Sequence, residues 1–160
     1  ERKTSIKMHA ESGSLLQFEI PAYQKIAVAL GFNENDVKLI SAAIGQGSQQ
    51  KEFILIHIVE SATARIHGEQ TSDYETIEDQ QRLDFFVNQL KEKGFSAKGI
   101  LGFKESSKEI VRIVKEEKAD MLVIGAHGHS GLQDFIYGST INTVRHELKI
   151  PVLIVNLYFF

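Results

Sequence analysis

Five short apolar runs that alternate with helical patterns constrain the fold of this chain most strongly. The runs cover residues 26–30, 53–59, 97–103, 119–124 and 152–155. Apolar residues fill most of each run, as expected for parallel strands that are covered on both faces. Between the runs, apolar residues recur three and four positions apart, which is typical of amphipathic helices. The alternation predicts an α/β fold in which a five-stranded parallel sheet carries helices on both faces.

Each of the four predicted helices has an apolar stripe that is expected to face the sheet. The stripes are Val37, Ile40 and Ile44; Leu83, Phe86, Val87 and Leu90; Ile110, Ile113 and Val114; and Ile141, Val144 and Leu148. The second helix is expected to begin near residue 72 and to end at Gly94. Ser106 and Glu109 have the spacing of a capping box at the start of the third helix. The fourth helix is predicted to begin at Ser139 and to end near residue 149.

A glycine-rich segment follows the fourth predicted strand. That strand runs into Gly125 and Gly128, and Gly138, Ser139 and Thr140 come next, with Gly138 ten positions after Gly128. Glycine lets a backbone approach a ligand closely because it has no Cβ. A helix N-terminus offers N–H groups without intrahelical partners and a partial positive charge. Together these features predict an anion site, most often a phosphate site, although three glycines can also serve tight turns alone.

Two other phosphate-binding motifs fit the sequence less well. A P-loop requires Gly-Lys-Ser/Thr, and no lysine occurs between Asp120 and Leu148. A dinucleotide fingerprint requires Gly-x-Gly-x-x-Gly after the first strand, where this chain has Gly31-Phe32-Asn33. The glycine segment therefore belongs to another class of site.

The pattern Gly125-x-x-Gly128, nine residues and Gly138-Ser139 resembles the nucleotide loop of the universal stress protein family. In nucleotide-binding members this loop wraps ATP or AMP. The resemblance implies a Rossmann-like fold, similar to adenine nucleotide alpha hydrolases, with strand order 3-2-1-4-5. It implies a nucleotide-binding domain at 25–156. Residues 1–24 have no clean hydrophobic period and are interpreted as a linker or extended N-terminal segment, and residues 157–160 are interpreted as a tail.

The resemblance also implies where a nucleotide lies. In open α/β sheets, ligands bind beyond the carboxyl ends of the strands, where the strand order reverses. The base is expected against the strand ends, and the phosphates at the glycine loop and the start of the fourth helix, with Mg²⁺ as an optional partner of ATP. The predicted nucleotide-binding residues are Gly31, Ile58, Ile124, Gly125, His127, Gly128, Gly138, Ser139 and Thr140.

One position departs from the family pattern. The first strand usually ends in an aspartate beside the nucleotide, and Gly31 stands at that position here. Loss of one charged hydrogen bond costs about 1.5–3 kcal/mol, which is roughly a ten- to hundred-fold loss of affinity. ATP, AMP, another adenine nucleotide and no nucleotide at all therefore remain open. The leading hypothesis is a nucleotide-binding regulatory domain that acts as a sensor, and the alternative is a dimerisation or interaction module.

The sequence predicts no catalytic residue and no metal ligand, so at most weak ATP hydrolysis is expected. His127 and His129 are one residue apart, but no carboxylate has convincing metal-ligand spacing, and both are interpreted as loop residues at the mouth of the site. His57 lies in an apolar run and is interpreted as a core histidine with its hydrogen bonds made. The acidic cluster at 73–79 is interpreted as a solvated helix start.

Composition and edge features suggest partners and location. The formal net charge of −3 gives no support for a nucleic-acid partner. The chain has no cysteine and no apolar run long enough to span a bilayer, which is compatible with the cytoplasm. The apolar fifth strand would be an exposed edge, and the family often dimerises there, so a homodimer is expected.

A further resemblance concerns residues 57–68, 73–76 and 145–151. These segments are similar to universal stress domains that follow Nramp-type divalent-metal transporters in some bacteria. The chain begins with Glu1 and not with an initiator methionine. We therefore expect it to be a fragment of a longer protein, such as the C-terminal domain of a transporter at the cytoplasmic side of the membrane. Its role would then be to regulate the fused transporter.

Overall fold

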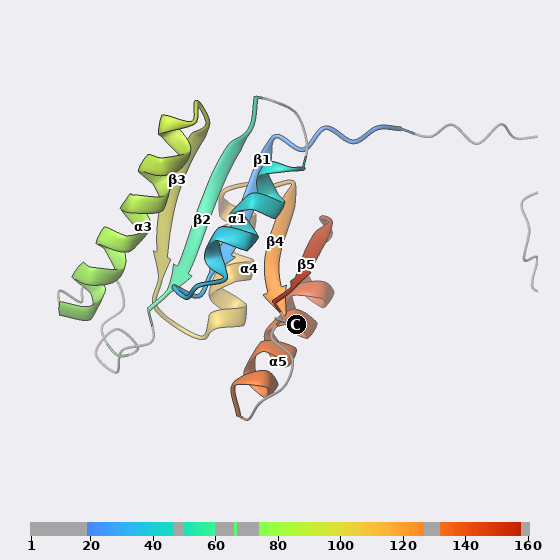
Figure 1. Ribbon diagram of the computed structural model, residues 1–160. Helices are drawn as coiled ribbons and strands as arrows, with labels where there is room; N and C mark the ends of the chain where they lie inside the picture. Colours follow the sequence, from blue (N-terminus) through green and yellow to red (C-terminus); the bar gives the residue numbers. More distant parts are fainter. Residues whose placement is uncertain (1–18, 47–49, 60–65, 67–73, 127–131, 158–160) are drawn as a thin grey trace, which may run out of the picture.

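The computed structural model describes residues 19–46, 50–59, 66, 74–126 and 132–157, with the backbone alone for 132–137. Within these residues the chain forms one parallel sheet of five strands (Figure 1). The strands are β1 (Lys25–Leu30), β2 (Glu52–Ile58), β3 (Ser96–Gly102), β4 (Met121–Ala126) and β5 (Val152–Asn156). Their order is β3-β2-β1-β4-β5, and every pairing is parallel. The predicted fold class and strand order are confirmed.

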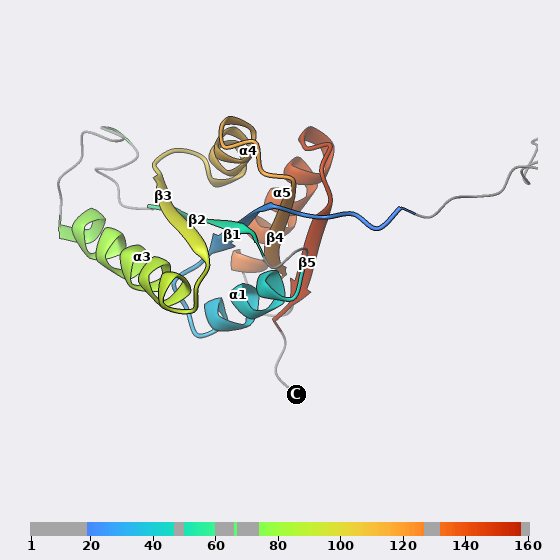
Figure 2. The same ribbon diagram turned by 90° about the horizontal axis from the view of Figure 1, so that it is seen from above.

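The helices cover both faces of the sheet. They are α1 (Asp36–Ile44), α3 (Tyr74–Glu92), α4 (Ser106–Glu116) and α5 (Leu132–Glu147). Seen from above, α1 and α3 lie on one face, and α4 and α5 lie on the other (Figure 2). Each face has its own apolar core. Leu39, Leu83 and Val87 belong to the first core, and Ile110, Ile113 and Val144 belong to the second.

Most of the predicted apolar stripes face the sheet, but the stripe of α1 is shifted. The predicted stripes of α3, α4 and α5 are buried or partly buried. In α1, Val37 is 65% exposed, and Leu39, Ile40 and Ala43 are the buried apolar residues. Because Val37 and Leu39 begin two equally regular stripes, the periodicity alone does not choose between them. The prediction for Val37 is therefore wrong.

Two helix ends were predicted from local motifs, with different outcomes. Gly94 has a φ of 88° after the end of α3, and the Phe95 N–H donates to the Leu90 carbonyl at 3.0 Å, as expected for a glycine-terminated helix. The capping box before α4 is wrong. Helix α4 begins after Glu105 without a side-chain cap bond, and the Glu109 carboxylate accepts instead from the Phe103 N–H at 3.1 Å.

The predicted start of the last helix is wrong by seven residues. Helix α5 begins at Leu132, so Gly138 and Ser139 lie within it. In the sequence, Leu132, Phe135 and Ile136 recur at spacings of three and four, so the helical period extends upstream of Gly138. One glycine inside a helix costs only about 1 kcal/mol relative to alanine and does not end it.

The topology defines one edge of the sheet as the place for a ligand. Strand β1 pairs with β2 on one side and with β4 on the other. The strand order reverses between β1 and β4, and all five arrowheads point toward the same edge (Figure 1). A crevice beyond that edge is the usual ligand position in such sheets.

Candidate functional site

A cavity of about 590 Å³ lies at the carboxyl ends of β1, β2 and β4. Five of the predicted site residues line it: Gly31, Ile58, Ile124, Gly125 and Thr140. They come from β2, β4, α5 and the loop that follows β1, which the fold brings to one edge of the sheet. Ile58, Ile124 and Thr140 are buried, so they form the floor of the cavity. The cavity therefore has an apolar base surrounded by polar groups, as small-molecule sites usually do.

The remaining predicted residues are not brought into this cavity. Gly138 and Ser139 are exposed on α5 and do not line it. Beyond the first turn of a helix, backbone N–H groups bond to carbonyls four residues earlier, so Gly138 does not present its N–H as a helix N-terminus would. His127 and Gly128 lie outside the described residues.

Gly125 is small for a packing reason. A Cβ at this position would overlap the side chain of Leu157, which is buried beside the end of β4. Leu157 also bonds to the sheet edge, because its N–H donates to the Ala126 carbonyl at 3.1 Å. The glycine thus admits Leu157 into the cavity wall, in addition to any approach of a ligand.

A carboxylate lies beside the strand end at which Gly31 has no side chain. Asp36, the first residue of α1, is only 1% exposed, and its Oδ1 accepts from the Gly31 N–H at 3.1 Å. Burial raises the pKa of Asp36, while the N–H groups of Gly31, Phe32 and Asn33 act in the opposite direction. Its Oδ2 has no hydrogen-bond partner among the described residues. Asp36 is not among the residues that the sequence predicts for the site.

His57 forms the wall next to Asp36. Its Nδ1 lies 2.9 Å from the Leu30 carbonyl oxygen, and its Nε2 lies 3.3 Å from Asp79 Oδ2. The imidazole stacks on Phe32, with ring centroids 3.7 Å apart and an interplanar angle of 18°. His57 therefore has the partners expected for it, but it lines the cavity and is not enclosed in the core.

Two further residues of the site lie on α3 and were not predicted from the sequence. Asp79 was expected on a solvated helix start, yet its side chain is only 13% exposed and faces His57. Arg82 lines the cavity and lies 3.2 Å from Glu78 one turn earlier. The signal available in the sequence was the spacing of three between Asp79 and Arg82, which places both on one side of a helix.

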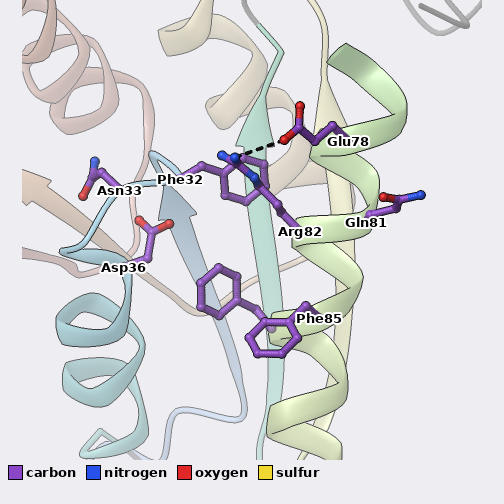
Figure 3. A pocket seen from close by; sticks show the side chains of 8 residues that line it. Phe32, Asn33, Asp36, Glu78, Gln81, Arg82 and Phe85 are labelled. Atoms are coloured by element: carbon purple, nitrogen blue, oxygen red, sulfur yellow. Dashed lines mark hydrogen bonds and ion pairs between the residues drawn. The ribbon is translucent and has the colours of Figure 1, made fainter. Parts of the chain in front are cut away.

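A second cavity of about 490 Å³ lies in the groove between α1 and α3. It shares Phe32, Asn33, Asp36 and Arg82 with the first cavity. Figure 3 shows Asn33 and Asp36 on the α1 side and Arg82 on the α3 side of this groove. Phe85, on α3, lines it and is 59% exposed. The strand-end cavity and the aromatic groove therefore adjoin each other along the residues around Asp36.

The fold and the strand-end cavity define a doubly wound α/β domain with a small-molecule site at its topological switch point. The profile of the universal stress protein family matches residues 22–156. The chain therefore belongs to the universal stress protein family. Within the described residues, no helix has the length and apolar character needed to cross a membrane.

Relatives of known structure share the fold. The universal stress protein MJ0577 of Methanocaldococcus jannaschii is 23% identical over 153 residues, covering 83% of this chain and 94% of that protein. Its structure superposes with a TM-score of 0.69 at 24% identity, over 88% of this chain and all of that one. A universal stress protein from Archaeoglobus fulgidus, solved in complex with dAMP, has a TM-score of 0.61 at 21% identity, over 84% and 99% of the two chains.

A third structure comes from a plant. The universal stress protein family protein At3g01520 of Arabidopsis thaliana, solved with AMP bound, has a TM-score of 0.55 at 17% identity. The match covers 83% of this chain and 91% of that one. At these identities, the structural likeness establishes the fold of the present chain and leaves its ligand to be argued from its own residues.

Proposed function

We propose that this domain binds an adenine nucleotide and acts as a regulatory sensor. The observation that carries the proposal is the cavity at the strand-order reversal, in which Gly31, Ile58, Ile124, Gly125 and Thr140 meet. Its volume of about 590 Å³ falls in the usual range for small-molecule sites. The complexes of two relatives with dAMP and AMP support the choice of an adenine nucleotide.

In this proposal, the two ends of the ligand meet different surfaces. The purine lies against Ile58 and Ile124, whose buried side chains offer an apolar slot. The phosphates extend toward Thr140 and the glycine segment that includes His127 and Gly128. Gly138 and Ser139 contact phosphate in this proposal only if the first turns of α5 rearrange when the nucleotide binds. AMP and ATP, the latter with Mg²⁺, are the candidate ligands.

A sensor is favoured over a catalyst by the sequence of the site. The glycine segment contains no lysine that could reach a transferred phosphoryl group. The histidine in the cavity wall, His57, has a backbone carbonyl and Asp79 as its close partners. Binding without efficient turnover is therefore the proposed activity, and ATP hydrolysis, where it occurs, is slow.

Thermal unfolding in the presence of nucleotides tests this function. At about a hundred times its dissociation constant, a ligand adds roughly 2.7 kcal/mol to the unfolding free energy. For a chain of this length, the midpoint should rise by roughly 5–10 °C. We expect the rise with millimolar AMP or ATP–Mg²⁺, a smaller one with GTP, and none in a Gly128→Leu variant that keeps its circular dichroism spectrum. Equal shifts for the variant and the wild type would contradict the proposed site.

A second candidate function, a dimerisation module, is favoured by the edge of the sheet. Strand β5 pairs with β4 on one side only within the described residues, and Ile154 on it is 39% exposed. Exposed apolar edges of this kind are usually covered or paired in native proteins. A homodimer through β5 would cover this edge. The corresponding biological role is regulation of a fused metal transporter by this domain, on the cytoplasmic side of the membrane.

Light scattering tests this second function. The wild type should be dimeric at tens of micromolar, and Ile154→Lys should shift it to a monomer because a buried unpaired charge opposes association. Lys149→Glu, an exposed charge change before β5, serves as the control. A monomeric wild type at high concentration would contradict the dimer.

A further inference from the structure

The carboxylate of Asp36 is the most unusual polar group in the wall of the strand-end cavity. Asp36 is 1% exposed and lines both this cavity and the neighbouring α1–α3 groove. One oxygen, Oδ1, accepts from the Gly31 N–H at 3.1 Å. The other, Oδ2, is buried without a hydrogen-bond partner among the described residues. Buried carboxylate oxygens without partners are rare because an unmade hydrogen bond leaves the cost of desolvation uncompensated.

The other acids around the cavity already have a different role or environment. Asp79 Oδ2 lies 3.3 Å from His57 Nε2. Glu78 accepts from Arg82 at 3.2 Å. Glu75 is exposed to solvent near the start of α3. Asp36 is therefore the acid of this cavity that keeps a buried oxygen without a hydrogen-bond partner among the described residues, and it lies beside Gly31, which has no side chain.

We infer that Asp36 is the ligand-recognising carboxylate of this cavity, accepting a hydrogen bond from a hydroxyl or amino group of the bound nucleotide. This inference rests on the proposed function. A ligand with a donor at this point would satisfy Oδ2 and compensate for its burial. The donor is either a sugar hydroxyl or the exocyclic amine of the base, and both have the same chemistry toward a carboxylate.

The loop that precedes α1 lies beside the carboxylate. The N–H groups of Phe32 and Asn33 face Asp36, and both residues also line the cavity. Phe32 has a φ of 55°, a region that L-residues with large side chains seldom adopt. A small outward shift of residues 32–33 would open Oδ2 to the ligand, while α1 holds Asp36 in place.

Isothermal titration of two charge-matched variants tests the role of Asp36. Asp36→Asn keeps an acceptor for the Gly31 N–H but replaces the second oxygen by an amide donor. The control is Glu34→Gln, which removes the same charge from an exposed residue in the same loop. We expect AMP to bind Asp36→Asn about 10- to 100-fold more weakly than the wild type. The affinity of Glu34→Gln should stay within about two-fold.

Four ligands distinguish the possible donors on the wild-type protein. AMP, 2′-deoxy-AMP, 3′-deoxy-AMP and inosine monophosphate differ in the two sugar hydroxyls and in the base amine. We expect one of the three analogues to bind at least about ten-fold more weakly than AMP, and this preference to disappear in Asp36→Asn. The wild-type half of this comparison needs no variant to fold, so equal binding of all four ligands would still overturn the inference if Asp36→Asn is unstable.

The outcomes separate the two proposals. If the wild type binds none of the four ligands, the nucleotide-binding function itself fails. If it binds AMP and Asp36→Asn binds AMP equally well, the assignment of Asp36 is overturned while the function stands. Equal affinity of the wild type for all four ligands would also overturn it, because no sugar hydroxyl or base amine would then donate to the carboxylate.

Discussion

Glu109 is a buried carboxylate that ties the end of β3 to α4. It is 7% exposed and accepts from the Phe103 N–H at 3.1 Å and from Arg112 Nε at 2.8 Å. These hydrogen bonds, chiefly the one from Arg112, hold the pKa of Glu109 below its ordinary value of 4.5, against the effect of burial. Because the folded-state pKa is lowered, the stabilisation is present above about pH 4.5 and is lost as the pH falls through the folded-state value.

Substitution of Glu109 should therefore lower the unfolding free energy at neutral pH and weaken the dependence of that free energy on pH in the acidic range. Glu109→Gln is expected to lower the unfolding free energy at pH 7 by about 1.5–3 kcal/mol, with a smaller loss at pH 3.5. The control is Glu116→Gln, because Glu116 also pairs with Arg112 but its side chain is 61% exposed, and surface pairs contribute about 0–1 kcal/mol. Urea denaturation at both pH values measures these differences. Equal losses for the two variants at pH 7 would contradict this account of Glu109.

At the scale of elements, α5 contributes Thr140 to the site. It begins at Leu132 and carries Thr140 to the cavity, while Gly138 lies in its interior and is exposed. A Cβ at Gly138 would meet no atom of the described residues within 4 Å. Glycine is thus not required there by packing in the ligand-free fold. Phosphate binding, as proposed above, would give a reason for glycine at this position.

Alanine at Gly138 separates helix stability from ligand binding. Gly138→Ala should raise the unfolding free energy by about 0.5–1 kcal/mol, since alanine is the better helix former. If Gly138 contacts phosphate, the same variant should bind AMP more weakly. Gly94→Ala is the matched comparison and should destabilise the protein, because Gly94 has a φ of 88°. A lowered melting temperature for Gly138→Ala would contradict the placement of this residue inside α5.

At the scale of the whole molecule, two apolar cores hold the sheet from opposite faces and leave its carboxyl edge for the site. Helices α1 and α3 cover one face, and α4 and α5 cover the other (Figure 2). The cavity is built from residues of both layers, such as Asp36 from α1 and Thr140 from α5. Ligand binding at this edge would therefore connect the two layers, which is how a nucleotide could change the outer surfaces of a sensor.

The sequence predicted this architecture well because strands and amphipathic helices alternate without interruption. The strand order came from the resemblance to a family and was confirmed by the pairing of β1 with both β2 and β4. The sequence could not predict where the side chains of Asp36 and Asp79 point. In the sequence, Asp79 belongs to an acidic cluster at a helix start and Asp36 to no site motif, and only the fold brings Asp36 back to Gly31 and Asp79 to His57.

The local errors have a common physical cause. Val37 satisfies the helical period as well as Leu39 does, and the sheet selects Leu39. Glu109 fits a capping box, but the Phe103 N–H and Arg112 bind its carboxylate instead. In each case the local pattern permits two arrangements, and contacts that the pattern does not encode decide between them.

The central claim, that an adenine nucleotide occupies the strand-end cavity, is tested most directly by nuclear magnetic resonance. In a ¹⁵N–¹H correlation titration with AMP, we predict the largest shifts for the amides of Gly31, Ile58, Gly125 and Thr140. The amides of β3 near Ser96, at the opposite end of the sheet, should stay in place. Saturable shifts confined to β5 or to the groove around Phe85, or no shifts at millimolar AMP, would contradict the claim.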